Sequence, residues 1–243
     1  MIKGIYTSAS AMIPRVKKQE VTANNVANAG TTGFKKDKVF TRELSRAVSQ
    51  QKPKRTDWHQ PMIDKVFVDF TPGVFDKTDN PLDLALEGDG FFTLESPDGQ
   101  TVLTRSGAFQ IDSEGFLSFP GGFRLVGEGG AIQVGNGELN VGLDGEIEVN
   151  GLPVDRIVPR SVADTAALNR LGGSLFAVPE GEELIPAISA TIRQGYLETS
   201  NVDVVREMVE MMISYRAYEA NAKALQQQDS SLDDLFTKVG GKR

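Results

Sequence analysis

The sequence predicts an α+β protein in which long helices at the two ends form a coiled-coil-like pair and flank a central antiparallel β-rich domain. Near both termini, apolar residues recur at alternating spacings of three and four, which is typical of paired helices. In the middle, dipeptides that favour tight hairpins separate short apolar runs. Apolar residues make up 40% of the 243 residues, which is enough for a packed core in one large or two modest domains.

The N-terminal helix is predicted from a heptad pattern, in which one narrow apolar stripe is buried against another helix. Pro14 lies inside this helix and removes one backbone hydrogen bond, so we expect a kink there. The small residues from Ala29 to Gly33 then end the helix. The stripe consists of Ile2, Ile5, Ala9, Met12, Val16, Gln19, Ala23 and Val26.

The C-terminal helix carries the same pattern over more turns, from about 202 to 238, and would be roughly 55 Å long. Ser200 and Asp203 resemble a capping box at its start. Because the stripe is narrow and the helix long, we expect the termini to pair with each other or with copies of the chain. The stripe consists of Val204, Met208, Met211, Tyr215, Tyr218, Ala222, Leu225, Asp229, Leu232 and Phe236.

The middle of the chain, from about 65 to 190, consists of short apolar runs separated by turn residues. Strands at a spacing of about 8–16 residues indicate an antiparallel barrel or sandwich. Residues 42–64 have no clear period, and we interpret them as part of an extended connector. The hairpin dipeptides are Asp98-Gly99, Asn136-Gly137, Asp144-Gly145 and Asn150-Gly151.

The charge is unevenly distributed along the chain. Residues 1–55 hold 12 basic and 3 acidic residues, whereas the remaining 188 hold 14 basic and 30 acidic residues, giving a net charge of −7. A basic head on an acidic body fits nucleic acid, anionic lipid, or attraction between the head of one copy and the body of the next. A solvated charged arm is an equal alternative. Nucleic-acid binding is disfavoured, because the basic residues lack interleaved aromatic side chains for stacking on bases.

The composition excludes several kinds of catalytic and metal site. Cysteine is absent, so the chain has no disulfide, cysteine–zinc site or thiol catalysis. The single histidine, His59, stands beside Trp58 without a recognisable nucleophile motif, so we expect a surface or packed side chain. Three acids in predicted turns could bind calcium, but they lack the ligand rhythm of an EF-hand, and we expect solvated hairpin acids. These are Asp98, Asp112 and Glu114.

The glycine clusters at 88–90, 121–122 and 127–130 are predicted to be turns, because no Lys-Ser/Thr follows them as in a phosphate-binding loop. We therefore predict no catalytic, cofactor or metal site, and no enzyme. A β-rich hydrolase is the alternative from a different class, and Glu87 and Asp89 are the acids it would use. No apolar run is long enough to span a membrane, and no apolar signal-peptide region follows Lys3. We therefore expect export, if any, by a route without a cleaved signal, and no insertion into the membrane.

Three segments together resemble the flagellar rod, hook and basal-body axial protein family of bacteria. The first resembles the N-terminal signature of that family, the second lies in the middle, and the third leads into the C-terminal helix and continues farther along it. Their order and their spread over most of the chain make the resemblance specific, although 140–190 has no match as sharp. The segments are 23–28 with 31–35, 80–92 with 104–109, Asp112, Gly115 and Leu117, and 194–202 with 216–221.

The resemblance implies a structural subunit of the flagellar basal-body rod, which assembles helically into the drive shaft that transmits torque from motor to hook. The length favours a proximal rod subunit; a distal rod subunit or another hook–basal-body axial subunit is the alternative. Implied partners are copies of the chain, other rod subunits and the flagellar type III export apparatus. The implied location is the basal body, where the rod crosses the periplasm or cell wall.

The resemblance also implies a division of the chain into an inner tube and an outer domain. Residues 1–33 and 191–243 would form the helices of the inner tube, 34–80 the extended connector and 81–190 the β-rich outer domain. The predicted assembly interface is the stripe on both helices. Its residues are Ile5, Met12, Val16, Ala23, Val26, Val204, Met208, Met211, Tyr215, Tyr218, Leu225, Leu232 and Phe236.

Overall fold

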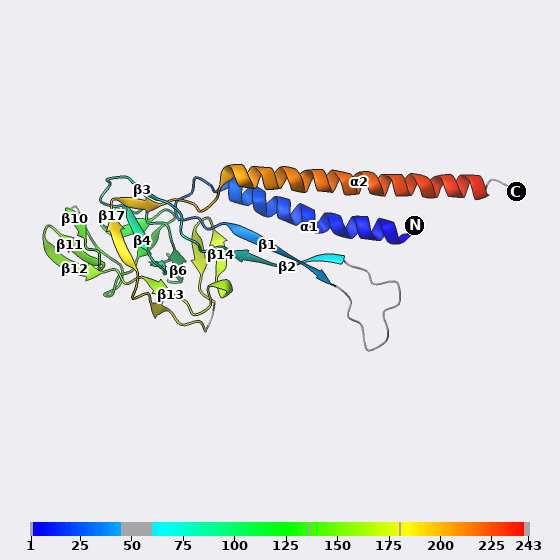
Figure 1. Ribbon diagram of the computed structural model, residues 1–243. Helices are drawn as coiled ribbons and strands as arrows, with labels where there is room; N and C mark the ends of the chain where they lie inside the picture. Colours follow the sequence, from blue (N-terminus) through cyan, green and yellow to red (C-terminus); the bar gives the residue numbers. More distant parts are fainter. Residues whose placement is uncertain (1, 45–59, 136, 180, 241–243) are drawn as a thin grey trace. The chain divides into compact units, whose positions relative to one another are not determined.

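The computed structural model describes residues 2–44, 60–135, 137–179 and 181–240. The predicted α+β class is confirmed, because the described sequence begins and ends with a helix and the elements between them in chain order are mostly antiparallel strands (Figure 1). The chain forms two compact units. The first comprises Met1–Ala27, Asp37–Asp69 and Asp203–Arg243, and the second comprises Asn28–Lys36 and Phe70–Val202.

The first unit is built on helices α1 (Ile2–Ala27) and α2 (Val204–Gly240), which pack side by side and antiparallel (Figure 1). The α1 helix runs through Pro14 without interruption. The expected capping box at Ser200 is wrong: Asp203 is the N-cap of α2, because its Oδ1 accepts a hydrogen bond from Arg206 N at 3.1 Å. Ser200 Oγ instead accepts from Val202 N.

Strands β1 (Asp37–Leu44) and β2 (Gln60–Val68) form an antiparallel pair that contacts α1. The structure therefore differs from the predicted connector, because its described part contains paired strands rather than an unpaired extended segment. The pairing register shifts between Phe40 and Thr41. Such a shift changes which face the following residues occupy, so the sequence has no continuous two-residue period.

The second unit consists of short strands, and every strand pairing recorded in it is antiparallel. Its largest sheet in the described residues has the order β14-β15-β6-β5-β9-β8-β7. The second unit also contains a three-stranded sheet, β10-β11-β12, and the strand pairs β4–β17, β3–β18 and β13–β16. The strands are β3 (Phe75–Lys77), β4 (Leu84–Glu87), β5 (Phe92–Glu95), β6 (Thr101–Thr104), β7 (Gln110–Ile111), β8 (Leu117–Phe119), β9 (Phe123–Leu125), β10 (Leu139–Val141), β11 (Glu146–Val149), β12 (Leu152–Arg156), β13 (Arg160–Ser161), β14 (Asn169–Gly172), β15 (Leu175–Ala177), β16 (Ile185–Pro186), β17 (Thr191–Gln194) and β18 (Tyr196–Glu198).

The hairpin dipeptides occupy the predicted turns wherever the structure describes them. Asn150 and Gly151 have φ angles of 53° and 78° and join the paired residues Val149 and Leu152, as a two-residue turn requires. Gly99 and Gly145 also have positive φ, in the turns before β6 and β11. The Asn136-Gly137 turn is not fully described, because Asn136 lies outside the described residues.

The core of the second unit joins several of its sheets. Each fully buried aliphatic or aromatic side chain contributes about 1.5–3 kcal/mol through removal of apolar surface from water. The cluster includes Leu84 and Leu86 of β4 and Ile192 of β17, and so holds these two paired strands against the larger sheet. Its members are Leu84, Leu86, Phe92, Leu94, Val102, Phe109, Leu117, Leu125, Ile132, Val134, Leu139, Val141, Ile147, Ile157 and Ile192.

Candidate assembly site

Polar side chains join α1 to α2 within the first unit. Lys18 Nζ lies 2.6 Å from Glu210 Oε2, and this hydrogen bond holds the pKa of the Glu210 carboxyl below its ordinary value. Ser214, which is 1% exposed, donates from Oγ to the carbonyl oxygen of Arg15 at 3.1 Å. Glu207 Oε2 accepts from Asn25 Nδ2 at 3.3 Å. Polar contacts therefore fix the antiparallel register of the two helices.

Asn25 also ties α1 to the start of β1. Its Nδ2 donates to the carbonyl oxygen of Asp37 and its Oδ1 accepts from Asp37 N, both at 2.9 Å. The side chain is 1% exposed. This buried amide therefore makes its hydrogen bonds within the chain, and the sequence pattern gave no sign of that partner.

The predicted interface residues fall into two groups in the isolated chain. One group is half-buried and the other is exposed, while the side chains of Ile5 and Phe236 are outside the description. The half-buried residues are Met12, Val26, Met211, Tyr218, Leu225 and Leu232. The exposed residues are Val16, Ala23, Val204, Met208 and Tyr215.

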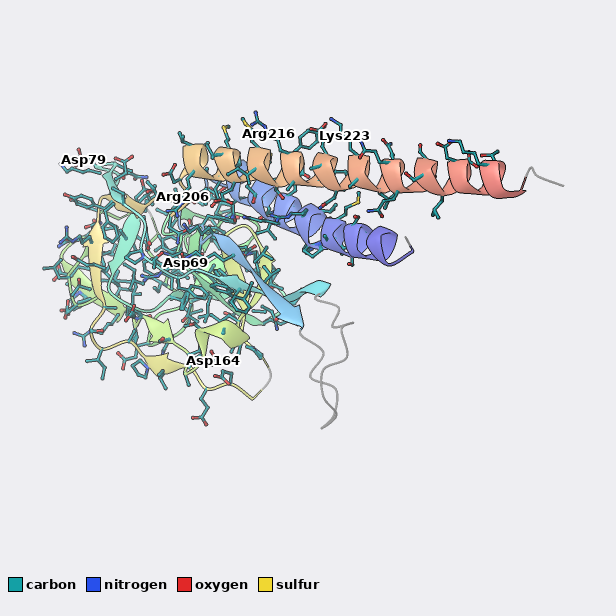
Figure 2. The ribbon with its side chains drawn as sticks, turned by 45° about the vertical axis from the view of Figure 1, so that its right-hand side comes forward. Asp69, Asp79, Asp164, Arg206, Arg216 and Lys223 are labelled. Atoms are coloured by element: carbon teal, nitrogen blue, oxygen red, sulfur yellow. The ribbon has the colours of Figure 1, made fainter. Side chains whose placement is uncertain are left out.

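The first three turns of α2 present an exposed apolar face, which we call the α2 apolar face. At 100° per residue, its members span about half of the helix circumference. Farther along α2, Arg216, Glu219 and Lys223 are exposed on this side; Figure 2 shows Arg216 and Lys223 on the side of α2 away from α1. The α2 apolar face consists of Val204, Val205, Met208, Val209, Met212, Ile213 and Tyr215, with exposures from 36% to 73%.

The second unit contains a fully buried ion pair between Lys35 and Glu198. Lys35 Nζ lies 2.5 Å from Glu198 Oε1, and both side chains are 0% exposed. Lys35 Nζ also donates to the carbonyl oxygen of Thr71 at 2.9 Å. Glu198 Oε1 accepts a further hydrogen bond from Gly73 N, also at 2.9 Å. Since buried charges are costly unless paired and hydrogen-bonded, these contacts compensate each charge.

Arg105 places a second cation beside this pair. Its Nη1 lies 3.8 Å from Glu198 Oε2, an oxygen that has no hydrogen-bond partner among the described residues. The guanidinium donates to the carbonyl oxygens of Leu86 and Gly88. Burial lowers the pKa of the Arg105 guanidinium, and the nearby Glu198 carboxylate opposes that shift. The core strand β4 thereby anchors the charge that faces Glu198.

An aromatic cluster adjoins the buried ion pair. Arg170 stacks over the rings of Phe34 and Phe176, with its Cζ 4.6 Å and 5.0 Å from the ring centroids. It also donates to the carbonyl oxygen of Lys35. Phe70 packs edge-on against Phe91 at 5.4 Å between centroids. The segment that contains Lys35 is therefore held on both its main chain and its side chain.

Three flagellar protein families match successive parts of the chain. Residues 5–35 match "Flagella basal body rod protein", residues 85–149 match "Flagellar hook protein FlgE/F/G D1 domain", and residues 193–237 match "Flagellar basal body rod FlgEFG protein C-terminal". The flagellar basal-body rod protein FlgF of Caulobacter vibrioides is 33% identical over 93% of both chains. The chain belongs to the flagellar basal-body rod protein family. It is a structural subunit, located in the basal body of the bacterial flagellum.

Other relatives match this rod protein along nearly its whole length. FlgF of Mesorhizobium japonicum is 30% identical over 100% of both chains. The rod protein FlgG of Borreliella burgdorferi is 30% identical over 96% of this chain and 97% of its own. The alignment with this FlgF spans 246 positions and that with FlgG spans 261, so the chain is FlgF-like in length.

The three matched regions of this rod protein meet at the buried ion pair. Lys35 ends the first region, Arg105 lies in the second and Glu198 lies in the third. Thr32 and Ser106 add a contact of 2.7 Å between their hydroxyl oxygens. All of these residues lie in motifs visible in the sequence, but the sequence does not reveal the cluster, because a lysine and a glutamate 163 residues apart carry no sign of their pairing.

The acids considered for calcium binding lie in turns, and Asp112 and Glu114 pair with Arg124 there. Asp112 Oδ1 accepts hydrogen bonds from the main-chain N of Phe116 and, with a smaller effect, of Glu114, and these lower the pKa of its carboxyl. Arg124 pairs with both Asp112 and Glu114, at 3.2 Å and 2.6 Å. Among the described residues, no group of three or more histidines and acids is placed to hold a metal ion.

The remaining candidate residues also have structural roles or lie outside the description. Glu87 pairs with Arg193 at 2.7 Å on the surface. Gly88 and Gly90 have positive φ in a turn, which agrees with the predicted turns at the glycine clusters. His59 lies outside the described residues. In the described part of the chain, neither helix has an apolar stretch long enough to cross a membrane.

Proposed function

We propose that this rod subunit assembles through its terminal helices, which form a coiled-coil-like pair and contact copies of the chain and other rod subunits. The observation that carries the proposal is the α2 apolar face. Single exposed apolar side chains are ordinary, but seven on three turns of one helix are typical of a surface that another protein covers. The predicted interface residues Val204, Met208 and Tyr215 belong to this face.

The geometry of assembly follows from the two sides of α2. One side faces α1 through Ser214 and Glu207, so the apolar face remains available to another subunit. A face that meets a different surface on the next copy makes a head-to-tail contact, and such contacts form helical filaments when they do not close into a ring. Burial of each apolar side chain contributes roughly 1.5–3 kcal/mol, so several together stabilise a filament.

The finer parts of the proposal concern domains and partners. In it, the helices form the inner tube, the β-rich unit lies outside, and the rod transmits torque from motor to hook. The flagellar type III export apparatus delivers the subunit. Family membership supports these roles, as does the charge contrast between units. The first unit has 17 basic and 13 acidic residues, and the second has 9 basic and 20 acidic residues, so opposite net charges favour contact between units of different copies.

Replacing Met212 by aspartate tests the proposed interface. Met212 is 55% exposed in the isolated chain, so Met212→Asp should leave the unfolding midpoint of the monomer nearly unchanged. In the assembled rod it buries an unpaired carboxylate, at a cost of about 3 kcal/mol or more. We expect self-association to weaken by about 100-fold and motility to be lost. Sedimentation of the purified chain and swimming of the mutant strain measure these effects.

Lys223→Asp is the matched control, because it introduces the same carboxylate on the same exposed side of α2, where charged residues already lie. It should retain at least most of the assembly. Equal behaviour of the two variants, whether both assemble or both fail, would contradict an interface at the α2 apolar face.

A further inference from the structure

The chain passes between its two units four times, after Ala27, Lys36, Asp69 and Val202. Three segments of the second unit carry these passages: 28–36, 70–74 and 195–202. If they were independent, each would be a short single-stranded link. Their hydrogen bonds therefore decide whether force between the units passes through separate links or through one joined structure.

The Lys35–Glu198 pair joins all three segments within the second unit. Lys35 comes from the first segment and Glu198 from the third, and their 2.5 Å contact is fully buried. Both also bind the middle segment, since Lys35 Nζ donates to Thr71 O and Glu198 Oε1 accepts from Gly73 N, each at 2.9 Å. One ion pair thus makes a contact with every passage segment.

Asn201 repeats this three-way connection with neutral groups. Its Oδ1 accepts from Lys36 N at 2.8 Å, and its Nδ2 donates to the carbonyl oxygen of Thr71 at 3.0 Å. Main-chain hydrogen bonds add to it, from Gly33 N to Glu198 O at 2.7 Å and from Thr199 N to Val74 O at 2.8 Å. The Lys35–Glu198 pair and Asn201 bind the same three segments at different positions, so the segments are connected along their length.

The β core anchors this arrangement. Arg105 lies 3.8 Å from Glu198 and donates to carbonyl oxygens of residues 86 and 88, at the end of β4. Removal of Glu198 alone would leave two buried cations, Lys35 and Arg105, without their carboxylate. Replacement of both Lys35 and Glu198 by apolar residues of similar volume leaves only Arg105, which keeps its hydrogen bonds to the carbonyl oxygens of residues 86 and 88. The double replacement therefore removes the connection at a smaller loss of stability than Glu198→Met alone.

We propose that Lys35, Glu198 and Asn201 form a clasp that holds the three passage segments together and transmits torque between the helical unit and the β-rich unit. The role in torque rests on the proposed rod function, whereas the joining of the segments does not. Force applied to α2 reaches 195–202 first, and the clasp shares it with 28–36 and 70–74. In this role the three side chains hold the segments in place through their hydrogen bonds.

The double variant Lys35→Met/Glu198→Met tests the clasp in the purified full chain. Its unfolding midpoint should fall less than that of Glu198→Met alone, because only the Arg105 cation remains and it keeps its hydrogen bonds to two carbonyl oxygens. The amides of Gly73 and Thr199 should exchange hydrogen about tenfold faster or more, since the contacts that hold their segments are lost. In cells, rods should form, but swimming should fail at a lower medium viscosity. Unchanged exchange would overturn the clasp.

The matched control is Glu87→Met/Arg193→Met, which removes a surface ion pair of the same unit. It should alter neither exchange in the passage segments nor the viscosity limit. Faster exchange in the clasp variant with an unchanged viscosity limit would overturn the torque role. If the clasp variant does not fold, Asn201→Ala is the second test, with the same expected changes. Failure of the rod function itself would appear as normal assembly of Met212→Asp, an outcome independent of amide exchange.

Discussion

Gly33 illustrates how single residues set the geometry at which the matched regions meet. Its φ angle is +65°, a conformation that residues with a Cβ rarely adopt. A Cβ there would lie 2.2 Å from Ser106 N. The glycine therefore permits the close approach of the segment before Lys35 to the strand end that carries Arg105.

Gly33→Ala should destabilise the second unit by about 2 kcal/mol or more, through backbone strain and the clash with Ser106. Urea unfolding monitored by circular dichroism measures the change. Gly30→Ala is the matched control, because a Cβ at Gly30 meets nothing within 4 Å. If both variants unfold at the same denaturant concentration, the close approach at Gly33 does not contribute to stability.

The sequence identifies the segments that contain the clasp residues, but it does not predict what these residues do. Lys35 and Glu198 both lie in segments quoted for the family resemblance, but a charged residue in a motif is usually exposed. Their burial depends on the fold that brings residues 163 positions apart together. Asn201 likewise lies in a segment that carries the family resemblance, and it binds two other segments.

At the scale of helices, strands and turns, patterns formed by residues close in sequence predict the structure best. The Asn150-Gly151 turn follows from the backbone preferences of two residues, and the structure has it. The β1–β2 pair was missed because its register shift at Phe40 interrupts the alternation that identifies a strand. The heptad pattern identified both helices, but not the side of each that faces its partner. On α2, apolar residues such as Met211 and Met212 occupy both sides over the first turns, so spacing alone does not separate them.

A one-residue insertion after Ala222 tests whether the second half of α2 must keep its register. Every later residue would rotate by about 100°, which moves Leu225 and Leu232 away from their present side of the helix. We expect loss of rod assembly while the second unit stays folded. Electron microscopy of basal bodies measures the first effect, and protease resistance of the β-rich unit measures the second. A one-residue insertion after Gly181, in an exposed turn, should be tolerated; normal rods from the Ala222 insertion would show that this half of α2 is outside the interface.

At the scale of the whole molecule, the charge is divided between the units rather than between the ends of the chain. The first unit has a net charge of +4 and the second of −11. The basic head predicted from residues 1–55 is therefore mostly in the helical unit, although Lys35 and Lys36 belong to the other. Opposite charges on two units of every copy favour head-to-body contact between copies, and they oppose contact between two β-rich units.

This division predicts that self-association depends on salt. Between 0.1 M and 1 M salt, the screening length falls from about 10 Å to about 3 Å, so attraction between oppositely charged units of different copies is largely removed. We expect the association rate to fall by about tenfold or more, because electrostatic steering acts mainly on encounter. Light scattering of the purified chain at increasing salt measures the rate, with Met212→Asp as the control that lacks the apolar contact. Contact through the α2 apolar face alone would instead give a rate that stays constant or rises with salt, and that result would contradict a role for the charge division.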